Sequence, residues 1–143
     1  MDNLHLGQHI SQQFNEELED IRNKVLEMGG FVEEQVGRAV KALVEGNTAL
    51  AKQVVADDYR VNALEVEIDE ECTRIVARRQ PAASDLRLVM AVIKTISDLE
   101  RIGDEAKRVA KTVEDGLNGA MAEDVRHELQ HMGDLVREML RMI

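Results

Sequence analysis

Two pairs of acidic side chains are the residues of this sequence whose types and spacing could support chemistry. Glu65 and Asp69 are four residues apart, and so are Glu100 and Asp104. Residues four apart on a helix lie on one face, about 6 Å from each other. Each pair would therefore place two carboxylates side by side, and carboxylate oxygens are ligands for Mg²⁺, Ca²⁺, Mn²⁺ and iron. Because solvated helix surfaces often carry the same spacing, it permits a metal site without requiring one.

The two pairs are predicted to lie on neighbouring antiparallel helices. Apolar residues recur every three or four positions on both sides of Pro81, the only proline, which is typical of amphipathic helices. One helix is expected from Asn47 or Thr48 to Arg79, with a weak point at 56–58, and the next from about Ala82 to Asp115. A short connection makes such neighbours antiparallel, so the four carboxylates could face one site.

Two further helices complete the predicted fold. A long apolar stripe runs from about Gln8 to Glu45 and continues through Gly29-Gly30, which indicates one helix across the glycines. Another begins near Met121 and reaches the end of the chain. Neither strand alternation nor a disulfide framework is present in the sequence. The expected fold class is all-α, an antiparallel three-helix bundle with a fourth helix in spectrin-like up-down order.

Composition limits the classes of partner. The chain has 143 residues, 44% of them hydrophobic but only 2% aromatic, so the core must be aliphatic. Its formal net charge of −10 argues against nucleic acid as the main partner, since phosphate binding needs clustered Lys and Arg. No apolar run approaches the ~20 residues of a membrane-spanning helix, and no signal peptide is recognisable. A cytoplasmic protein without direct membrane insertion is therefore expected.

The sequence resembles the PhoU family of phosphate-uptake regulators. The resemblance is carried by HISQQFNEELEDIRNKVLEMGG, by EVEIDEEC and by QPAASDLRLVMAVIKTISDLERIGDEA, and it covers most of residues 8–115. It implies an all-helical protein built from tandem three-helix repeats, each with a Glu/Asp-x-x-x-Asp motif associated with metal binding. Carried over to this chain, that motif falls on Glu65/Asp69 and on Glu100/Asp104, with iron, zinc, manganese or magnesium as the ion.

The same resemblance implies a regulatory function rather than an enzymatic one. The family represses phosphate uptake and the phosphate-starvation response, and it is thought to act between the phosphate ABC transporter ATPase and a sensor histidine kinase of a two-component system that controls transcription. Residues 1–116 would form one repeat and residues 117–143 the first helix of an incomplete second repeat. Because that last helix would expose part of its apolar stripe, we expect a homodimer.

Other interpretations of the sequence stay open beside this one. A carboxylate-site metal-dependent hydrolase or a small oxidase would use the same four acids, and a metal-free helical adaptor would merely expose them. His127 and His131 fit the H-E-x-x-H pattern of zinc proteases, but a third ligand is missing, so ordinary surface histidines are favoured. Cys72 falls on an apolar stripe and is expected to be buried. A group of arginines near Pro81 either compensates a helix dipole or forms a basic patch for an acidic partner: Arg74, Arg78, Arg79 and Arg87.

Overall fold

The computed structural model describes the backbone of residues 2–116 and 122–141. Side chains are described for residues 12–116, 127–128, 131–136, 138 and 141. Within these ranges every regular element is a helix, which confirms the all-α prediction. The helices are α1 (Asp2–Glu45), α2 (Thr48–Asp57), α3 (Tyr59–Arg79), α4 (Ala83–Glu114) and α5 (Ala122–Arg141).

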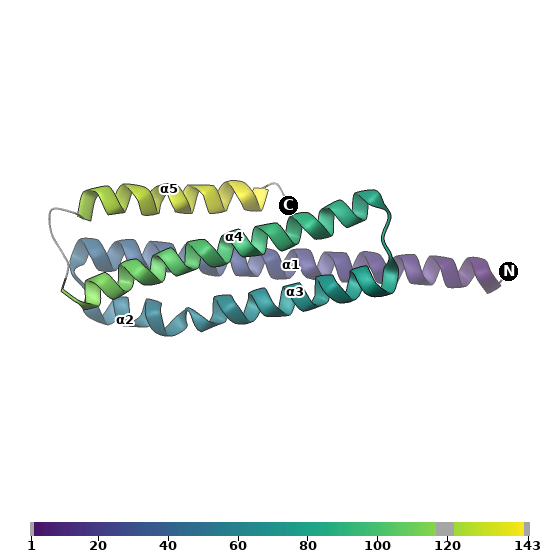
Figure 1. Cartoon of the computed structure of the whole chain (residues 1–143), viewed down its shortest axis with the longest axis horizontal. Coiled ribbons are helices and arrows are strands. Elements are labelled where there is room, and N and C mark those ends of the chain that lie inside the picture. The colour runs from purple at the N-terminus through teal and green to yellow at the C-terminus, as the bar shows by residue number, and fades with distance from the viewer. Residues whose placement is uncertain (1, 117–121, 142–143) are drawn as a thin grey trace.

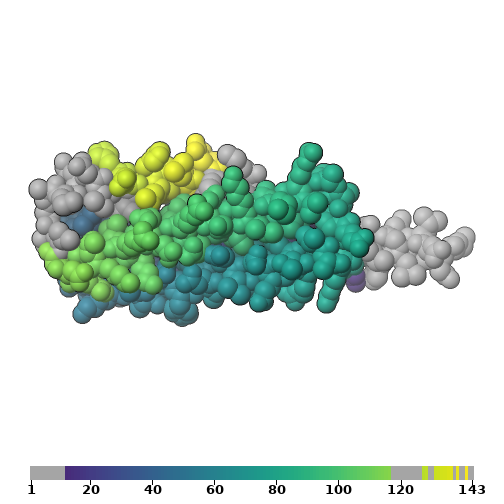
Figure 2. Space-filling view, in the orientation of Figure 1, coloured from purple at the N-terminus to yellow at the C-terminus, as the bar shows by residue number. Residues whose placement is uncertain are grey.

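The helices form an elongated antiparallel bundle. Figure 1 shows α1 along the length of the bundle, with α2 and α3 returning beside it. Helix α4 then runs antiparallel to α3, and α5 runs antiparallel to α4. Helix α4 packs against α1, α2 and α3, whereas α5 packs mainly against α1 and only lightly against α4. Figure 2 shows side chains of α4 against those of α2 and α3 along one face. The predicted three-helix bundle with an added helix and up-down order is therefore confirmed.

Helix α1 differs from its predicted range at one end only. It begins at Asp2 instead of near Gln8, and it continues through Gly29-Gly30 as predicted. Gly46 ends it with φ at 64°, a left-handed conformation that glycine adopts without a Cβ clash. Asn47 then caps α2, because its side-chain oxygen accepts a hydrogen bond from the backbone N–H of Leu50 at 3.1 Å.

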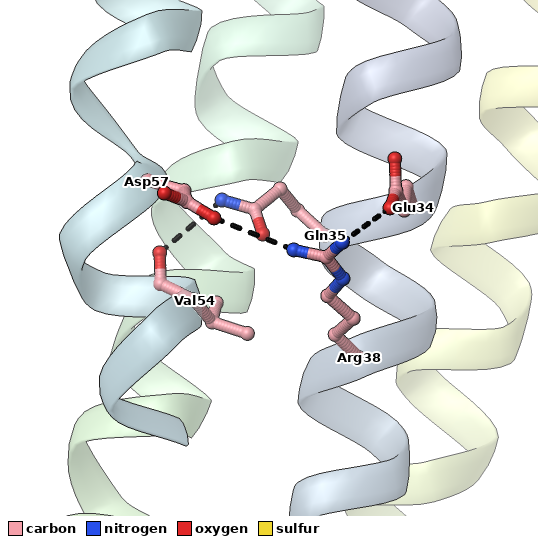
Figure 3. Close-up of polar contacts among 5 residues, drawn as sticks. All are labelled: Glu34, Gln35, Arg38, Val54 and Asp57. Atoms are coloured by element: carbon pink, nitrogen blue, oxygen red, sulfur yellow. Dashed lines mark hydrogen bonds and ion pairs between the residues drawn. The ribbon is translucent and has the colours of Figure 1, made fainter. Parts of the chain in front are cut away.

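The prediction of one continuous helix from residue 48 to residue 79 was wrong. The helix is interrupted at Asp58, which separates α2 from α3. The carbonyl of Val54, in the last turns of α2, accepts a hydrogen bond from Gln35 Nε2 at 3.2 Å. On the same side Arg38 Nη1 contacts Asp57 Oδ2 at 3.3 Å. Figure 3 shows these side chains of α1 reaching the joint between α2 and α3. Contacts from another helix therefore hold the interruption in place.

The turn around Pro81 follows the predicted end of the preceding helix. Helix α3 ends at Arg79, and Gln80 takes a left-handed conformation with φ at 43°. Helix α4 starts at Ala83, and no side chain caps its N-terminus. The reversal therefore depends on the left-handed backbone of Gln80, and Pro81 has no N–H with which to continue the helix.

The core is aliphatic, as the composition predicts. Buried positions recur every three or four residues along α1, α3 and α4, because such residues share one face of a helix. Leu86, in the first turn of α4, is 37% exposed, whereas Val92 is buried. The largest fully buried hydrophobic side chains are Ile21, Val25, Met28, Val32, Val54, Val61, Ile68, Val89, Ile96 and Leu99. In the described part of the chain, no helix is both long and apolar enough to cross a membrane.

Candidate metal-binding face

The structure brings both predicted acidic pairs to the contact between α3 and α4, which we call the acidic seam. Glu65 and Asp69 come from α3, and Glu100 and Asp104 come from α4. The helices pack against each other. Their acids are close enough across the contact that the charge of Asp104 raises the pKa of Glu65. Three of the four side chains are partly buried, and Asp69 is exposed.

Burial and repulsion from neighbouring carboxylates make Glu65 and Glu100 weaker acids. Burial contributes most to raising the pKa of Glu65, followed by the charges of Asp69 and Asp104. Burial, a hydrogen bond with Asp104 and the negative charges nearby raise the pKa of Glu100 to about 7. The charges that act on Glu100 include that of Glu65 on the neighbouring helix. The seam therefore favours bound protons or a cation, because both reduce the repulsion between its carboxylates.

Asp58 is a fifth acid beside the seam that the sequence analysis did not select. Its side chain is only 4% exposed, and Lys107 Nζ lies 3.5 Å from its Oδ2. Burial raises the pKa of Asp58 even though the charge of Lys107 lowers it, and Asp104 raises it further. The sequence signal was the weak point of the helix pattern at 56–58, where the polar Asp58 interrupts the apolar stripe. That signal indicated a defect in the helix and gave no indication of its partner.

Gly103 permits the close approach of α3 and α4 at the seam. It is buried and lies between Glu100 and Asp104 in the α4 sequence. A Cβ at this position would lie 3.4 Å from Val61 Cγ1 and 3.7 Å from Asp58 Oδ1. The small residue therefore lets the start of α3 pack directly on the backbone of α4, which holds the acids of the two helices near one another.

The donor set suits a hard cation, but the side chains are not arranged around one. Carboxylate oxygens from two helices are ligands that Mg²⁺, Mn²⁺ and iron accept. Within the described side chains, no group of three or more His, Cys, Asp or Glu residues is placed so as to hold a metal ion. Binding would therefore require the carboxylates of the acidic seam to turn toward a common point.

Comparison with known proteins identifies the family. A family model described as "PhoU domain" matches residues 25–113, which is well over half of the chain. The chain belongs to the PhoU family. The resemblance noted in the sequence is thereby confirmed, and the matched range contains all four residues of the acidic seam.

Long stretches of this PhoU chain are similar to known relatives. The phosphate-specific transport system accessory protein PhoU homolog of Pseudomonas putida is 52% identical over 136 residues, which cover 95% of this chain and 53% of the relative. The accessory protein PhoU of Escherichia coli (strain K12) is 46% identical over 149 aligned residues, covering 99% of this chain and 62% of the relative. The chain thus spans less than two thirds of the length of these relatives.

Solved structures of PhoU proteins share the fold. The crystal structure of PhoU from Pseudomonas aeruginosa matches with a TM-score of 0.74 and 47% identity, over 90% of this chain and 61% of that one. The phosphate transport system regulatory protein PhoU from Streptococcus pneumoniae matches with a TM-score of 0.72 and 30% identity, over 86% of this chain and 61% of that one. The division of this chain at residue 116 into two repeats stays a prediction.

The other residues of this PhoU chain that were considered as reactive groups are two histidines and one cysteine. His127 and His131 are exposed on α5, as expected for ordinary surface histidines. Cys72 is buried in α3, and burial raises the pKa of its thiol to about 11. Because the thiolate is the reactive form, this environment makes Cys72 unreactive at neutral pH. A small buried hydrophobe is the role that its position supports.

Proposed function

We propose that this chain is a non-enzymatic, metal-binding adaptor that represses phosphate uptake and phosphate-starvation signalling. It would act in the cytoplasm, between the ATPase of the phosphate ABC transporter and a sensor histidine kinase. The support for a role in phosphate transport is the name of the relatives, which are accessory proteins of a phosphate-specific transport system. The observation that carries the metal-binding part is the meeting of two acidic pairs from different helices at one seam.

In this proposal the ion joins α3 to α4. Glu65 and Asp69 would supply oxygen ligands from one helix, and Glu100 and Asp104 would supply them from the other. A cation would replace the repulsion between these carboxylates with attraction and would fix the relative position of the two helices. Since the pKa of Glu100 is about 7, binding near neutral pH would also release part of a proton from this group.

A metal-free helical adaptor is the second candidate. It is favoured by the spread of the acidic side chains, which form no ready-made group around one point in the described part of the chain. In that case protons, not metal ions, would reduce the repulsion at the seam, and the acids would mainly keep the surface negative and hydrated.

Calorimetric titration separates the two candidates. The protein, freed of metal by a chelator, is titrated with Mn²⁺, Fe²⁺, Zn²⁺ and Mg²⁺ in turn. The variant that removes the carboxylates of the acidic seam is Glu65→Gln/Asp69→Asn/Glu100→Gln/Asp104→Asn. The matched control removes four exposed acids of α1 and causes the same change in charge: Glu16→Gln, Glu19→Gln, Glu27→Gln and Glu45→Gln.

The expected result is saturable binding of at least one ion to the parent chain and to the control. The four-site variant should bind that ion at least about tenfold more weakly, equivalent to ~1.4 kcal/mol or more. Equal binding by both variants would place the ion elsewhere on the surface. Absence of binding to the parent chain would leave the metal-free adaptor.

We further propose that the chain forms a homodimer through the groove between the N-terminal part of α1 and the start of α4. Leu18, Leu88, Val89 and Val92 line this groove, and Leu88 is 42% exposed. Helix α5 lies beside the C-terminal half of α1 (Figure 1), so it does not cover this apolar region. A second copy would bury it. Light scattering at micromolar concentration tests the proposal, and a stable monomer would contradict it.

A further inference from the structure

The contact between α1 and α3, on the other side of α3 from the acidic seam, is held together by ion pairs. Lys24 of α1 lies within 4.0 Å of Asp20, Glu67 and Glu71. Near the Pro81 end, Arg79 Nη2 lies 2.8 Å from Glu17 Oε1. We call this contact the paired seam. Each of these four carboxylates therefore has a cationic partner, although Lys24 is shared by three of them.

Two arginines beside the paired seam have no such partner. Arg74 and Arg78 lie one turn apart on α3, and both side chains are exposed. Among the described residues neither makes a hydrogen bond or ion pair. With Ile75 they line one side of a shallow pocket of about 200 Å³. Two exposed arginines without an acidic partner are unusual in a chain whose net charge is −10.

We propose that Arg74 and Arg78 are a docking surface for a helix of a partner protein that carries two carboxylates one turn apart. Side chains four apart on each helix have the same spacing, so two helices laid side by side can form two Arg–carboxylate pairs at once. Arginine is suited to this role because its planar guanidinium can donate two parallel hydrogen bonds to one carboxylate.

The surroundings of the arginines favour an acidic helix over a small free anion. The other lining residues of the pocket are Glu17, Asp20 and Glu71, and a compact multivalent anion inside the pocket would lie close to all three carboxylates. A helix instead approaches from solvent, where the guanidinium groups are, and it distributes its charges over the two arginines. Repulsion from the rest of this acidic protein would then limit binding to partners that match the spacing.

This surface deepens the adaptor role proposed above, since an adaptor needs a defined contact with each partner. It does not depend on the metal or on the identity of the transporter and kinase. The test therefore uses a defined probe, so that failure of the docking surface can be told apart from failure of the adaptor role.

The test is a titration of the isotope-labelled protein, followed by NMR, with a designed helical peptide of about 20 residues, long enough to be helical in water. The peptide carries two glutamates one turn apart, and a second peptide carries glutamines there. The test variant is Arg74→Gln/Arg78→Gln. The control variant is Arg101→Gln/Arg108→Gln, which removes two exposed arginines of α4 that already contact Asp98 and Glu105 on their own helix.

The expected result is a saturable shift of the Arg74 and Arg78 signals with the glutamate peptide only. The test variant should bind at least about tenfold more weakly, and the control should stay within about twofold of the parent. Equal binding by the test variant, or an equal loss in the control, would overturn the proposal. Full competition by inorganic phosphate would show a small-anion site instead. A change in the oligomeric state of the test variant without peptide would make a second copy the occupant.

Discussion

Helix α3 is held on its two sides in opposite ways. On the paired seam with α1, the acids Glu67 and Glu71 meet Lys24, and Glu17 of α1 meets Arg79. On the acidic seam with α4, the carboxylates face each other. Among the described residues, the one ion pair between α4 and the joint of α2 and α3 is that of Lys107 with Asp58.

The difference shows where the molecule retains unfavourable charge. On the paired seam each acid of the ion pairs has a cation within 4.0 Å, so these contacts are attractive without any ligand. The acidic seam keeps like charges together and partly buried, which raises the pKa of Glu65 and Glu100 and costs free energy at neutral pH. A protein retains such a cost where a proton, a cation or a partner can relieve it.

The largest effect is expected from Lys107→Met. Removing this ammonium leaves the carboxylate of Asp58 buried with no ion-pair partner, and loss of one partner of a buried pair destabilises a protein by about 3 kcal/mol. The pKa of Asp58 is already raised, and it would rise further without Lys107. The loss of stability should therefore be greatest at neutral and alkaline pH and should shrink as acid protonates Asp58. Urea unfolding at several pH values measures it.

Two further variants decide whether this effect belongs to the acidic seam. Lys107→Met/Asp58→Asn should recover most of the lost stability, because the buried charge is then absent. Lys24→Met on the paired seam should cost less, about 1 to 2 kcal/mol, and the loss should depend on salt, because the acids around Lys24 are more exposed to solvent. A loss for Lys107→Met that does not depend on pH or on Asp58 would contradict this account.

The helices and the acidic pairs were predictable because both depend on local spacing. Apolar residues every three or four positions indicate helices, and the short turn at Pro81 makes α3 and α4 antiparallel. These two facts place Glu65/Asp69 and Glu100/Asp104 on neighbouring helices. Whether the carboxylates of the two pairs turn toward one point depends on the rotation of each helix and on the side-chain conformations, and the sequence left that open.

The interruption at Asp58 was not predictable, because it depends on contacts between helices. Gln35 of α1, which lies 19 residues before Val54 in the chain, donates a hydrogen bond to the Val54 carbonyl. Nothing in the local pattern of residues 48–79 indicates that partner. Lys107 was missed for the same reason, since its ion pair with Asp58 crosses from α4 to the joint. Local spacing therefore predicted the members of the seam and missed the residues that hold it together.

A smaller effect is expected from Glu100→Gln in the metal-free protein. The pKa of Glu100 is about 7 when folded, above its ordinary value, so the folded state binds the proton more tightly than the unfolded state. The cost of ionising Glu100 is absent below the unfolded pKa and is fully present above the folded pKa. Glutamine removes this cost and should stabilise the protein by about 1 kcal/mol near pH 8, after allowance for solvent screening.

The same substitution should have almost no effect near pH 4, where the glutamate is protonated and resembles glutamine in charge. Urea unfolding at the two pH values measures the difference, and Glu16→Gln on α1 is the control, which should show the same small effect at both. If Glu100→Gln destabilised the protein at about pH 8, the carboxylate would be making a favourable contact in the metal-free state. The acidic seam would then be no more strained than the paired seam.

The smallest effect is expected from Gly103→Ala, and it measures how closely the two helices meet at the acidic seam. Alanine in place of glycine within a helix stabilises it by about 1 kcal/mol, and Gly37 of α1 should give that full gain because nothing lies within 4 Å of an added Cβ. At Gly103 the Cβ would meet a methyl group of Val61 at 3.4 Å. This tight contact should reduce the gain to about 0.5 kcal/mol. Thermal unfolding of the two variants compares the gains in stability. An equal gain at both positions would mean that α3 and α4 leave more space at Gly103 than the 3.4 Å contact indicates.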